Sequence, residues 1–181
     1  MYTITRQIGI DAGHRVTHHG SKCRNLHGHR YTIQATCEAE SVIETGEQQG
    51  MVLDFGFLKD EMMEHIDAIC DHGMMLWVDD PLVEGFLPKD LTLEDVKRFV
   101  ASRGWSEIDD AVIGKMILLR EVPTAENLAK HWFNRLEERV HRRSEGHAKL
   151  TIMEVWETPN CVATYTPDIP EFLGQTHGEG R

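Results

Sequence analysis

The sequence lacks any long apolar run, and this absence narrows the class of protein. No stretch comes near the ~18 consecutive apolar residues that a membrane-spanning helix needs. The first residues, MYTITRQIGIDAGH, alternate polar and apolar side chains and lack the basic start and apolar block of a secretory signal. We therefore expect a cytoplasmic protein.

Positive charge is also scarce. The chain has 19 Lys and Arg residues against 30 Asp and Glu residues, which gives a net charge of -11. A chain this acidic is a poor general partner for nucleic acid or for an anionic membrane surface. Any bound anion would have to be held by a local group of cations.

Cysteine is sparse and irregularly spaced. The four residues are Cys23, Cys37, Cys70 and Cys161. A chain of 181 residues can bury a core without disulfide bonds, so we expect reduced thiols. The last three fall in apolar patterns and are expected in the core. Cys23 lies between Lys22 and Arg24, and nearby cations favour the reactive thiolate.

Hydrophobic periodicity predicts an α+β domain. Alternation of polar and apolar residues predicts strands, which are 2–10, 31–40, 149–158 and 161–167. One helix is expected after an Asp54 N-cap, with a buried stripe of Phe55, Leu58, Met62, Ile66 and Ile69. A second is expected after a Thr124 cap, with a stripe of Leu128, Trp132, Leu136 and Val140.

The chain length favours one domain over 1–167, with 77–119 as an inserted segment. Within that segment, a helix capped by Thr92 and ended by Gly104 is expected. The Gly-rich residues 168–181 are expected to form a flexible tail.

The stretch HRVTHHGSKCRNLHGHR concentrates the residues with metal-binding chemistry. His27 and His29 stand two apart at the start of a strand, so both imidazoles share one face, and His14 can supply a third nitrogen. Such a site keeps an open position for water or substrate. The alternative is that the His-x-His pair arises by chance in a histidine-rich chain. His18 and His19 are adjacent, point apart and are expected in solvent.

Two further groups could carry chemistry. Cys23 can act as a base or nucleophile, or it can close the metal site as a fourth ligand. Asp71 beside His72 can set the tautomer and basicity of the imidazole, although adjacent side chains more often diverge. These residue types alone do not separate the alternatives.

Six motifs in this order resemble one family. They are DAGHR, CRNLHGH, GMVLDFGFLK, DHGMML, PTAENLA and VWETPNCVATY. Together they resemble the family of the 6-pyruvoyl and 6-carboxytetrahydropterin synthases. The resemblance implies the tunnelling fold, a four-stranded antiparallel sheet with two helices packed on one face. It also implies trimers or hexamers with active sites at subunit interfaces.

The resemblance assigns roles position by position. The implied zinc ligands are His14, His27 and His29, and the implied catalytic residues are Cys23, Asp71 and His72, the last two contributed across a subunit interface. Glu157 is similar to the glutamate that anchors the pterin ring, because a carboxylate can accept two N–H bonds. Thr124 and Glu126 match the segment that lines the same pocket, although Thr124 can be a helix cap only.

The implied substrate is 7,8-dihydroneopterin triphosphate, whose side-chain hydroxyls zinc would hold. The favoured reaction is that of the carboxy branch, which releases acetaldehyde and triphosphate and leaves a 6-carboxyl group for queuosine or other 7-deazapurine synthesis. The alternatives are triphosphate elimination in the pyruvoyl branch, a non-catalytic zinc-stabilised module with Cys23 on the metal, and an aldolase-like enzyme. Enzymes of the last kind tend to carry glutamate where Cys23 stands.

Two departures from the family pattern stand out. Met75 and Leu76 replace the usual Leu-Asn after the Asp-His pair, and the segment 77–119 is longer than in compact members. The acidic residues of that segment are not expected to meet a triphosphate. Candidate cations for this role are Lys22, Arg24 and Arg30, which could equally be solvated surface charges.

Overall fold

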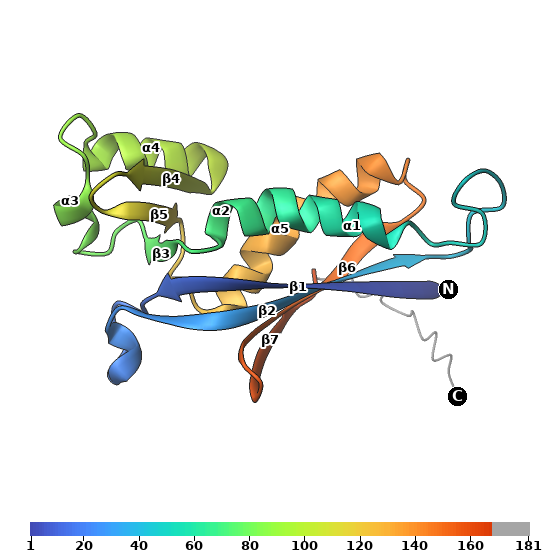
Figure 1. The fold of residues 1–181 in the computed structure, drawn as a ribbon, viewed down its shortest axis with the longest axis horizontal. Helices are drawn as coiled ribbons and strands as arrows, with labels where there is room; N and C mark the ends of the chain where they lie inside the picture. The colour runs from blue at the N-terminus through green and yellow to red at the C-terminus, as the bar shows by residue number, and fades with distance from the viewer. Residues whose placement is uncertain (168–181) are drawn as a thin grey trace, which may run out of the picture.

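The computed structural model describes residues 1–167, and the tail expected at 168–181 lies outside the described residues. The strands are β1 (Tyr2–His14), β2 (His27–Ala39), β3 (Met74–Trp77), β4 (Trp105–Asp110), β5 (Gly114–Leu119), β6 (Lys149–Thr158) and β7 (Cys161–Tyr165). The helices are η1 (Lys22–Arg24), α1 (Phe55–Met62), η2 (Met63–Asp67), α2 (Ala68–Cys70), α3 (Val83–Phe86), α4 (Leu93–Arg103) and α5 (Ala125–Arg143). Figure 1 shows α1 and α2 along one side of β1 and β2, with η1 on the opposite side.

The sheet contains the four predicted antiparallel strands and three more. Its order is β4-β5-β3-β1-β2-β6-β7, with β1, β2, β6 and β7 joined in antiparallel pairs. The expected count of four strands was therefore too low. β3 pairs in parallel with the end of β1, and β5 pairs in parallel with β3. Two such short apolar runs could not be told from buried helix or loop by periodicity, because only the tertiary pairing makes them strands.

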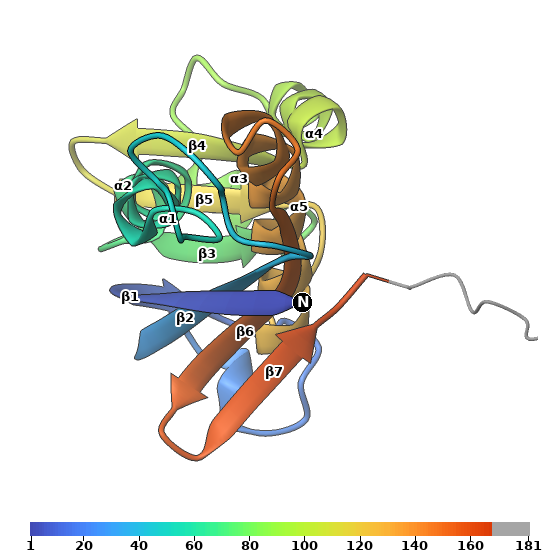
Figure 2. The same cartoon turned by 90° about the vertical axis from the view of Figure 1, so that its right-hand side faces the viewer.

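The two predicted helices pack on the same face of the antiparallel strands (Figures 1 and 2). Their shared core with the sheet includes Ile10, Tyr31, Leu58, Trp132 and Val155. The stripes predicted for the two helices are confirmed with one exception. Phe55 is 52% exposed, because it stands in the first turn of α1, before the helix reaches the sheet.

Helix ends follow the predicted capping chemistry. The Asp54 carboxylate accepts a hydrogen bond from the Gly56 N–H at 2.6 Å, and the Thr124 hydroxyl accepts from the Asn127 N–H at 3.4 Å. Gly104 ends α4 with a φ of 84°, a left-handed conformation that glycine adopts without strain. The sequence therefore predicted these three helix ends correctly, two starts and one stop.

The segment between Val78 and Leu119 builds a small second core. The helix predicted there, α4, is confirmed, and it packs against β3, β4 and β5. The buried side chains of this core are Leu76, Val78, Val83, Val96, Val100, Ile108, Met116 and Leu118. Leu76 and Met75, the departures from the family pattern, are fully buried. They serve packing rather than a substrate loop.

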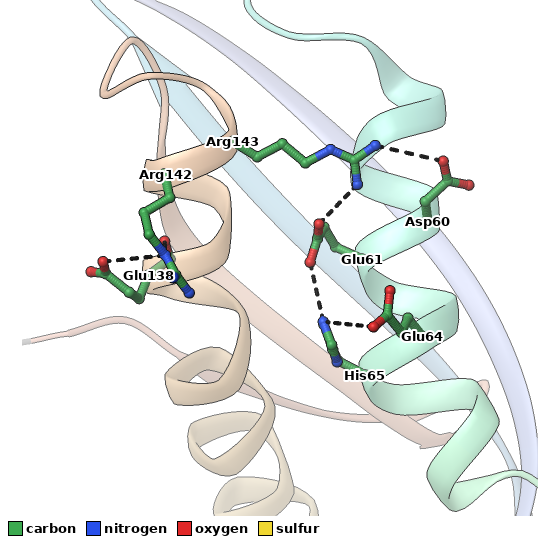
Figure 3. A network of polar contacts seen from close by, with 7 residues as sticks. All are labelled: Asp60, Glu61, Glu64, His65, Glu138, Arg142 and Arg143. Carbon is green, nitrogen blue, oxygen red and sulfur yellow. Dashed lines mark hydrogen bonds and ion pairs between the residues drawn. The ribbon is translucent and has the colours of Figure 1, made fainter.

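Charged side chains join the C-terminal end of α5 to α1 and η2 (Figure 3). Glu61 is buried, and its two carboxylate oxygens lie 2.9 Å from Arg143 Nη1 and 3.3 Å from His65 Nε2. Asp60 and Glu64 complete the group from the exposed side, 3.9 Å from Arg143 Nη2 and 3.7 Å from His65 Nε2. We call Glu61, His65 and Arg143 the Glu61 network.

All four cysteines are free thiols, as expected. Cys37 and Cys70 are buried, and burial raises the pKa of both thiols, to about 12 and about 11. Cys161 is exposed, so its expected place in the core is wrong: it opens β7 directly after the hairpin turn. Within residues 1–167, no helix combines the length and apolar character needed to cross a membrane.

Candidate functional site

Three histidines converge where β1 ends and β2 begins. The antiparallel register places His14 opposite His27 and Ala12 opposite His29, so all three imidazoles project from the same face. One nitrogen of each lies within 4.8 Å of the others. Among the His, Cys, Asp and Glu side chains of residues 1–167, these three alone form such a group, and Cys23 lies outside it.

Backbone carbonyls fix the tautomers of two of these rings. His14 Nδ1 lies 2.6 Å from the Pro123 carbonyl oxygen, and His27 Nδ1 lies 2.8 Å from the Asn25 carbonyl oxygen. A carbonyl only accepts, so each Nδ1 carries the proton and each Nε2 presents a lone pair. The two Nε2 atoms are 3.1 Å apart. Two lone pairs at this separation repel each other unless a cation lies between them.

The electrostatics of the rings favour the same state. Burial lowers the pKa of His14 to about 4, the Pro123 carbonyl opposes this, and the neighbouring His27 and His29 lower it further. Burial, with a contribution from His27, also lowers the pKa of His29. Neutral imidazoles are the form that binds metals. Three nitrogen donors of borderline softness with one open side suit Zn²⁺, so the donor set fits the metal implied by the motif.

Glu157 lies beside the histidines. Its carboxylate, carried by β6, is 3.8 Å from His14 Nε2 and a quarter exposed. Partial burial raises the pKa of Glu157, the nearby Glu126 raises it further, and His27 opposes both. Glu126 occupies the first turn of α5, directly after the Thr124 cap. The Pro123 carbonyl that holds His14 therefore also places the start of α5 next to the three histidines, which we call the histidine cluster.

The side chains of Asp71 and His72 contact each other, although the side chains of adjacent residues more often diverge. His72 Nδ1 donates to Asp71 Oδ2 at 2.6 Å, while Asp71 Oδ1 accepts from the Asp11 N–H at 2.8 Å. His72 adopts a φ of 56°, and its own N–H donates to the Asp11 carbonyl at 2.7 Å. This unusual backbone turns the two side chains toward each other at the edge of β1.

The acidity of Asp71 agrees with a relay role. Desolvation raises its pKa, but the hydrogen bonds from the Asp11 N–H and from His72 outweigh it, so the pKa of Asp71 lies below its usual value. The His72 side chain is 78% exposed. It lines, with His29, a shallow hollow of about 570 Å³. The imidazole is thus open to a ligand or to a neighbouring subunit.

Cys23 lies in the single helical turn η1 and is partly buried. Its carbonyl accepts a hydrogen bond from the Val16 N–H at 2.9 Å. No hydrogen bond of residues 1–167 joins it to Asp71 or His72. The structure therefore assembles the three histidines with Glu157, and separately the Asp71–His72 pair. The catalytic role of Cys23 stays a prediction.

Several residues of the site could not be, or were not, predicted from the sequence. The carbonyls of Pro123 and Asn25 gave no signal, because any residue carries a carbonyl. Tyr31 continues the 27, 29 spacing, is fully buried, and stacks edge-on against His29 and His14 at ring distances of 5.5 and 5.8 Å. The two-residue period of His27 and His29 could have predicted that Tyr31 lies on the same face of the strand.

The three side chains predicted as candidate cations for a triphosphate differ in their surroundings. Lys22 and Arg24 are exposed on η1 beside Cys23. Arg30 pairs with Asp11 at 2.5 Å on the sheet surface, so its charge is already partly compensated. Of the three, the two residues that flank Cys23 are the better placed to meet an anion at that loop.

Comparison with known proteins agrees with the geometry. The family model described as 6-pyruvoyl tetrahydropterin synthase matches residues 3–168. A 6-carboxy-5,6,7,8-tetrahydropterin synthase of Rickettsia conorii is 32% identical over 161 residues, covering 89% of this chain and 97% of the relative. The Aquifex aeolicus protein of the same name is 27% identical and covers 91% and 97%.

Solved structures support the same fold. An uncharacterized protein from Wolinella succinogenes superposes with a TM-score of 0.70 at 22% identity, covering 92% of this chain and 98% of that one. The 6-pyruvoyl tetrahydropterin synthase of Caenorhabditis elegans superposes with a TM-score of 0.57 at 23% identity, covering 92% and 96%. The predicted tunnelling fold is confirmed. The chain belongs to the 6-pyruvoyl tetrahydropterin synthase family of enzymes.

Proposed function

We propose that this chain is a zinc-dependent 6-carboxy-5,6,7,8-tetrahydropterin synthase. It would convert 7,8-dihydroneopterin triphosphate to the 6-carboxy product, with release of acetaldehyde and triphosphate. The observation that carries the proposal is the pair of Nε2 lone pairs of His14 and His27, 3.1 Å apart beside His29, which a metal cation would stabilise. The curated relatives that bear the carboxy name favour this branch over the pyruvoyl one.

Each residue has a defined task in this proposal. Glu157 accepts N–H bonds from the pterin ring, and Glu126 and Thr124 shape the same pocket at the start of α5. Bound zinc supplies Lewis acidity toward the side-chain hydroxyls. Cys23 takes the proton next to the ring imine, and His72, held by Asp71, hands protons on.

The proposal includes an assembly. Among residues 1–167, no hydrogen bond or ion pair joins the Asp71–His72 pair to Cys23, and the His72 ring is exposed. A trimer or hexamer in which the pair from one subunit meets Cys23 of another would complete the triad. We further propose a cytoplasmic location, and a single domain over 1–167 with 77–119 as its insertion.

The product of one incubation tests the reaction. Purified, zinc-loaded protein given 7,8-dihydroneopterin triphosphate should release acetaldehyde and triphosphate in equal amounts. A pyruvoyl product without acetaldehyde would assign the chain to the other branch. No turnover of this substrate, with glycolaldehyde formed from dihydroneopterin itself, would instead indicate the aldolase-like activity.

A second experiment separates the enzyme from a non-catalytic module. In the enzyme, the Cys23→Ala variant keeps its zinc and loses activity, because the cysteine lies outside the histidine group. In a module with Cys23 bound to the metal, the same variant loses zinc affinity. Metal content after dialysis against a weak chelator distinguishes the two.

A further inference from the structure

The segment 15–26, which joins β1 to β2, carries Cys23 and is mostly exposed. We call it the Cys23 loop. Its own short-range bonds include that from the Val16 N–H to the Cys23 carbonyl, at 2.9 Å. A loop on the surface samples many positions unless another element holds it, and a base misplaced by 1 Å loses much of its effect. The source of that hold is therefore relevant to catalysis.

Asp80, at the start of the inserted segment, is the remote contact of this loop. Its side chain is fully buried, and one carboxylate oxygen accepts from the Thr17 hydroxyl. The same oxygen lies 3.0 Å from Arg15 Nε, an ion pair outside hydrogen-bond geometry. Among residues 1–167, the side-chain hydrogen bonds and ion pairs that join the Cys23 loop to a distant segment all end on Asp80.

Asp80 is itself held rigidly. Its second carboxylate oxygen accepts from the Leu82 N–H at 2.9 Å, and its N–H donates to the Trp77 carbonyl at 2.9 Å. Its carbonyl accepts from the Val83 N–H, also at 2.9 Å. Val83 is fully buried in the second core. The carboxylate therefore stands on a turn that the inserted segment fixes from within.

The connection from this turn to the cysteine is short. Arg15 and Thr17, the two residues that Asp80 contacts, flank Val16, and Val16 binds the Cys23 carbonyl. A second contact runs in parallel, because the His18 ring packs edge-on against Trp77 with 5.7 Å between the ring centres. The inserted segment thus holds the first part of the loop at three side chains, those of Arg15, Thr17 and His18, two of them through Asp80.

Burying a carboxylate costs free energy that one arginine, one hydroxyl and one backbone N–H only partly offset. A surface turn with a neutral residue would close this core at lower cost. The contacts of the Asp80 carboxylate with Arg15 and Thr17 account for a charge at this position. We propose that Asp80 is a positioning residue for Cys23, and that the inserted segment serves the reaction by fixing the loop that carries the base. This inference rests on the proposed function only for the role of Cys23.

The test compares two neighbouring aspartates. Asp80→Asn removes the buried charge at constant shape, while Asp79→Asn removes a surface charge that pairs with Lys97 at 2.5 Å. In Asp80→Asn we expect kcat to fall by ~10- to 100-fold with KM and zinc content little changed, because positioning acts on the chemical step. Asp79→Asn should match the wild type.

Two readouts report on the loop without activity. The rate at which iodoacetamide alkylates Cys23, and the hydrogen exchange of the Val16 N–H, should both rise by ~10-fold in Asp80→Asn, because the loop opens more often. The visible spectrum of the cobalt-substituted protein should stay that of the wild type, since the histidines are unchanged. If Asp80→Asn folds poorly, Thr17→Val removes one loop contact and leaves the turn of Asp80 intact.

The outcomes separate this inference from the proposed function. Faster alkylation and exchange in Asp80→Asn, in a protein that does not turn over the pterin, would support the anchor while the proposed reaction fails. Reduced kcat with unchanged alkylation and exchange would overturn the positioning role. So would an equal effect of Asp79→Asn, because a general loss of negative charge would then explain both variants.

Discussion

Two clusters in this molecule pair histidine with carboxylate across different elements, and they differ in how they are completed. In the Glu61 network, the acid accepts from Arg143 at 2.9 Å, so opposite charges face each other, and it lies 3.3 Å from His65 Nε2. In the histidine cluster, Nε2 of His14 and Nε2 of His27 face each other at 3.1 Å with both protons held elsewhere.

The difference separates a structural cluster from a functional one. The Glu61 network is satisfied by groups of the chain itself and needs no ligand to be stable. In the histidine cluster, no group of residues 1–167 donates to the two facing Nε2 lone pairs, while the carbonyls of Pro123 and Asn25 orient the rings so that a cation could bind there. Polar residues of the same type thus serve stability in one place and chemistry in the other.

The largest expected effect comes from breaking the histidine cluster. The His27→Ala variant should lose stoichiometric zinc and all measurable synthase activity, because two nitrogens hold the ion poorly. It should not lower the free energy of unfolding of the metal-free protein, since it removes a lone-pair repulsion. Metal analysis and urea unfolding after chelation check both parts. A clear destabilisation of the metal-free variant would contradict the open character of the cluster.

The next effect concerns the base. The Cys23→Ala variant should lose ~10² to 10⁴-fold in kcat, the usual contribution of a general base, while zinc content stays at the wild-type level. Cys161→Ala is the matched control, because that thiol is exposed and has no task in the proposed reaction. Activity in Cys23→Ala equal to that of Cys161→Ala would remove the cysteine from the mechanism.

A smaller effect is expected in the Glu61 network. Glu61→Ala leaves the Arg143 and His65 nitrogens without their buried acceptor, so the free energy of unfolding should fall by about 1 to 3 kcal/mol. Zinc content and activity should stay within about twofold of the wild type, because Arg143 ends α5 while Glu126, near the histidines, lies in its first turn. Asp60→Ala, which removes an exposed partner 3.9 Å from Arg143, is the control.

The smallest effect is a pH dependence. Burial and the nearby Arg139 lower the pKa of His65, with Glu64 and Glu61 opposing them. The folded state then binds fewer protons at this site than the unfolded state, so the stability it contributes is present above the usual histidine pKa and declines as the pH falls below it. Between pH 7.5 and 5.5, the urea midpoint should shift less in His65→Gln than in the wild type. An equal shift in both proteins would assign the dependence elsewhere.

Local chemistry made the antiparallel half of the fold predictable. The strand alternation that puts His27 and His29 on one face, the Thr124 cap and the apolar stripe of α5 all act within a few residues. β3 and β5 could not be predicted in the same way. β3 pairs with β1, and β5 pairs with β3, so both pairings join residues far apart in the chain, and each run is short enough to suit several structures.

The candidate site shows the same division. Residue type and spacing identified the three histidines, but not the carbonyls that orient them. Asp79 and Asp80 look alike in the sequence, yet Asp79 is exposed and pairs with a surface lysine, whereas Asp80 is buried against the Cys23 loop. Burial decides between them, and burial depends on the tertiary structure.

The short pairing of β3 with β1 has a consequence for assembly. β3 joins β1 only at Gly13 and His14, and the backbone of Asp11 is taken up by the turn at Asp71–His72. From Thr3 to Gly9, the outer side of β1 meets no other strand within the described chain. An open edge of this length is a template for unwanted strand addition in an isolated subunit. Closing the sheet against neighbouring subunits would convert that hazard into a specific, self-limiting contact.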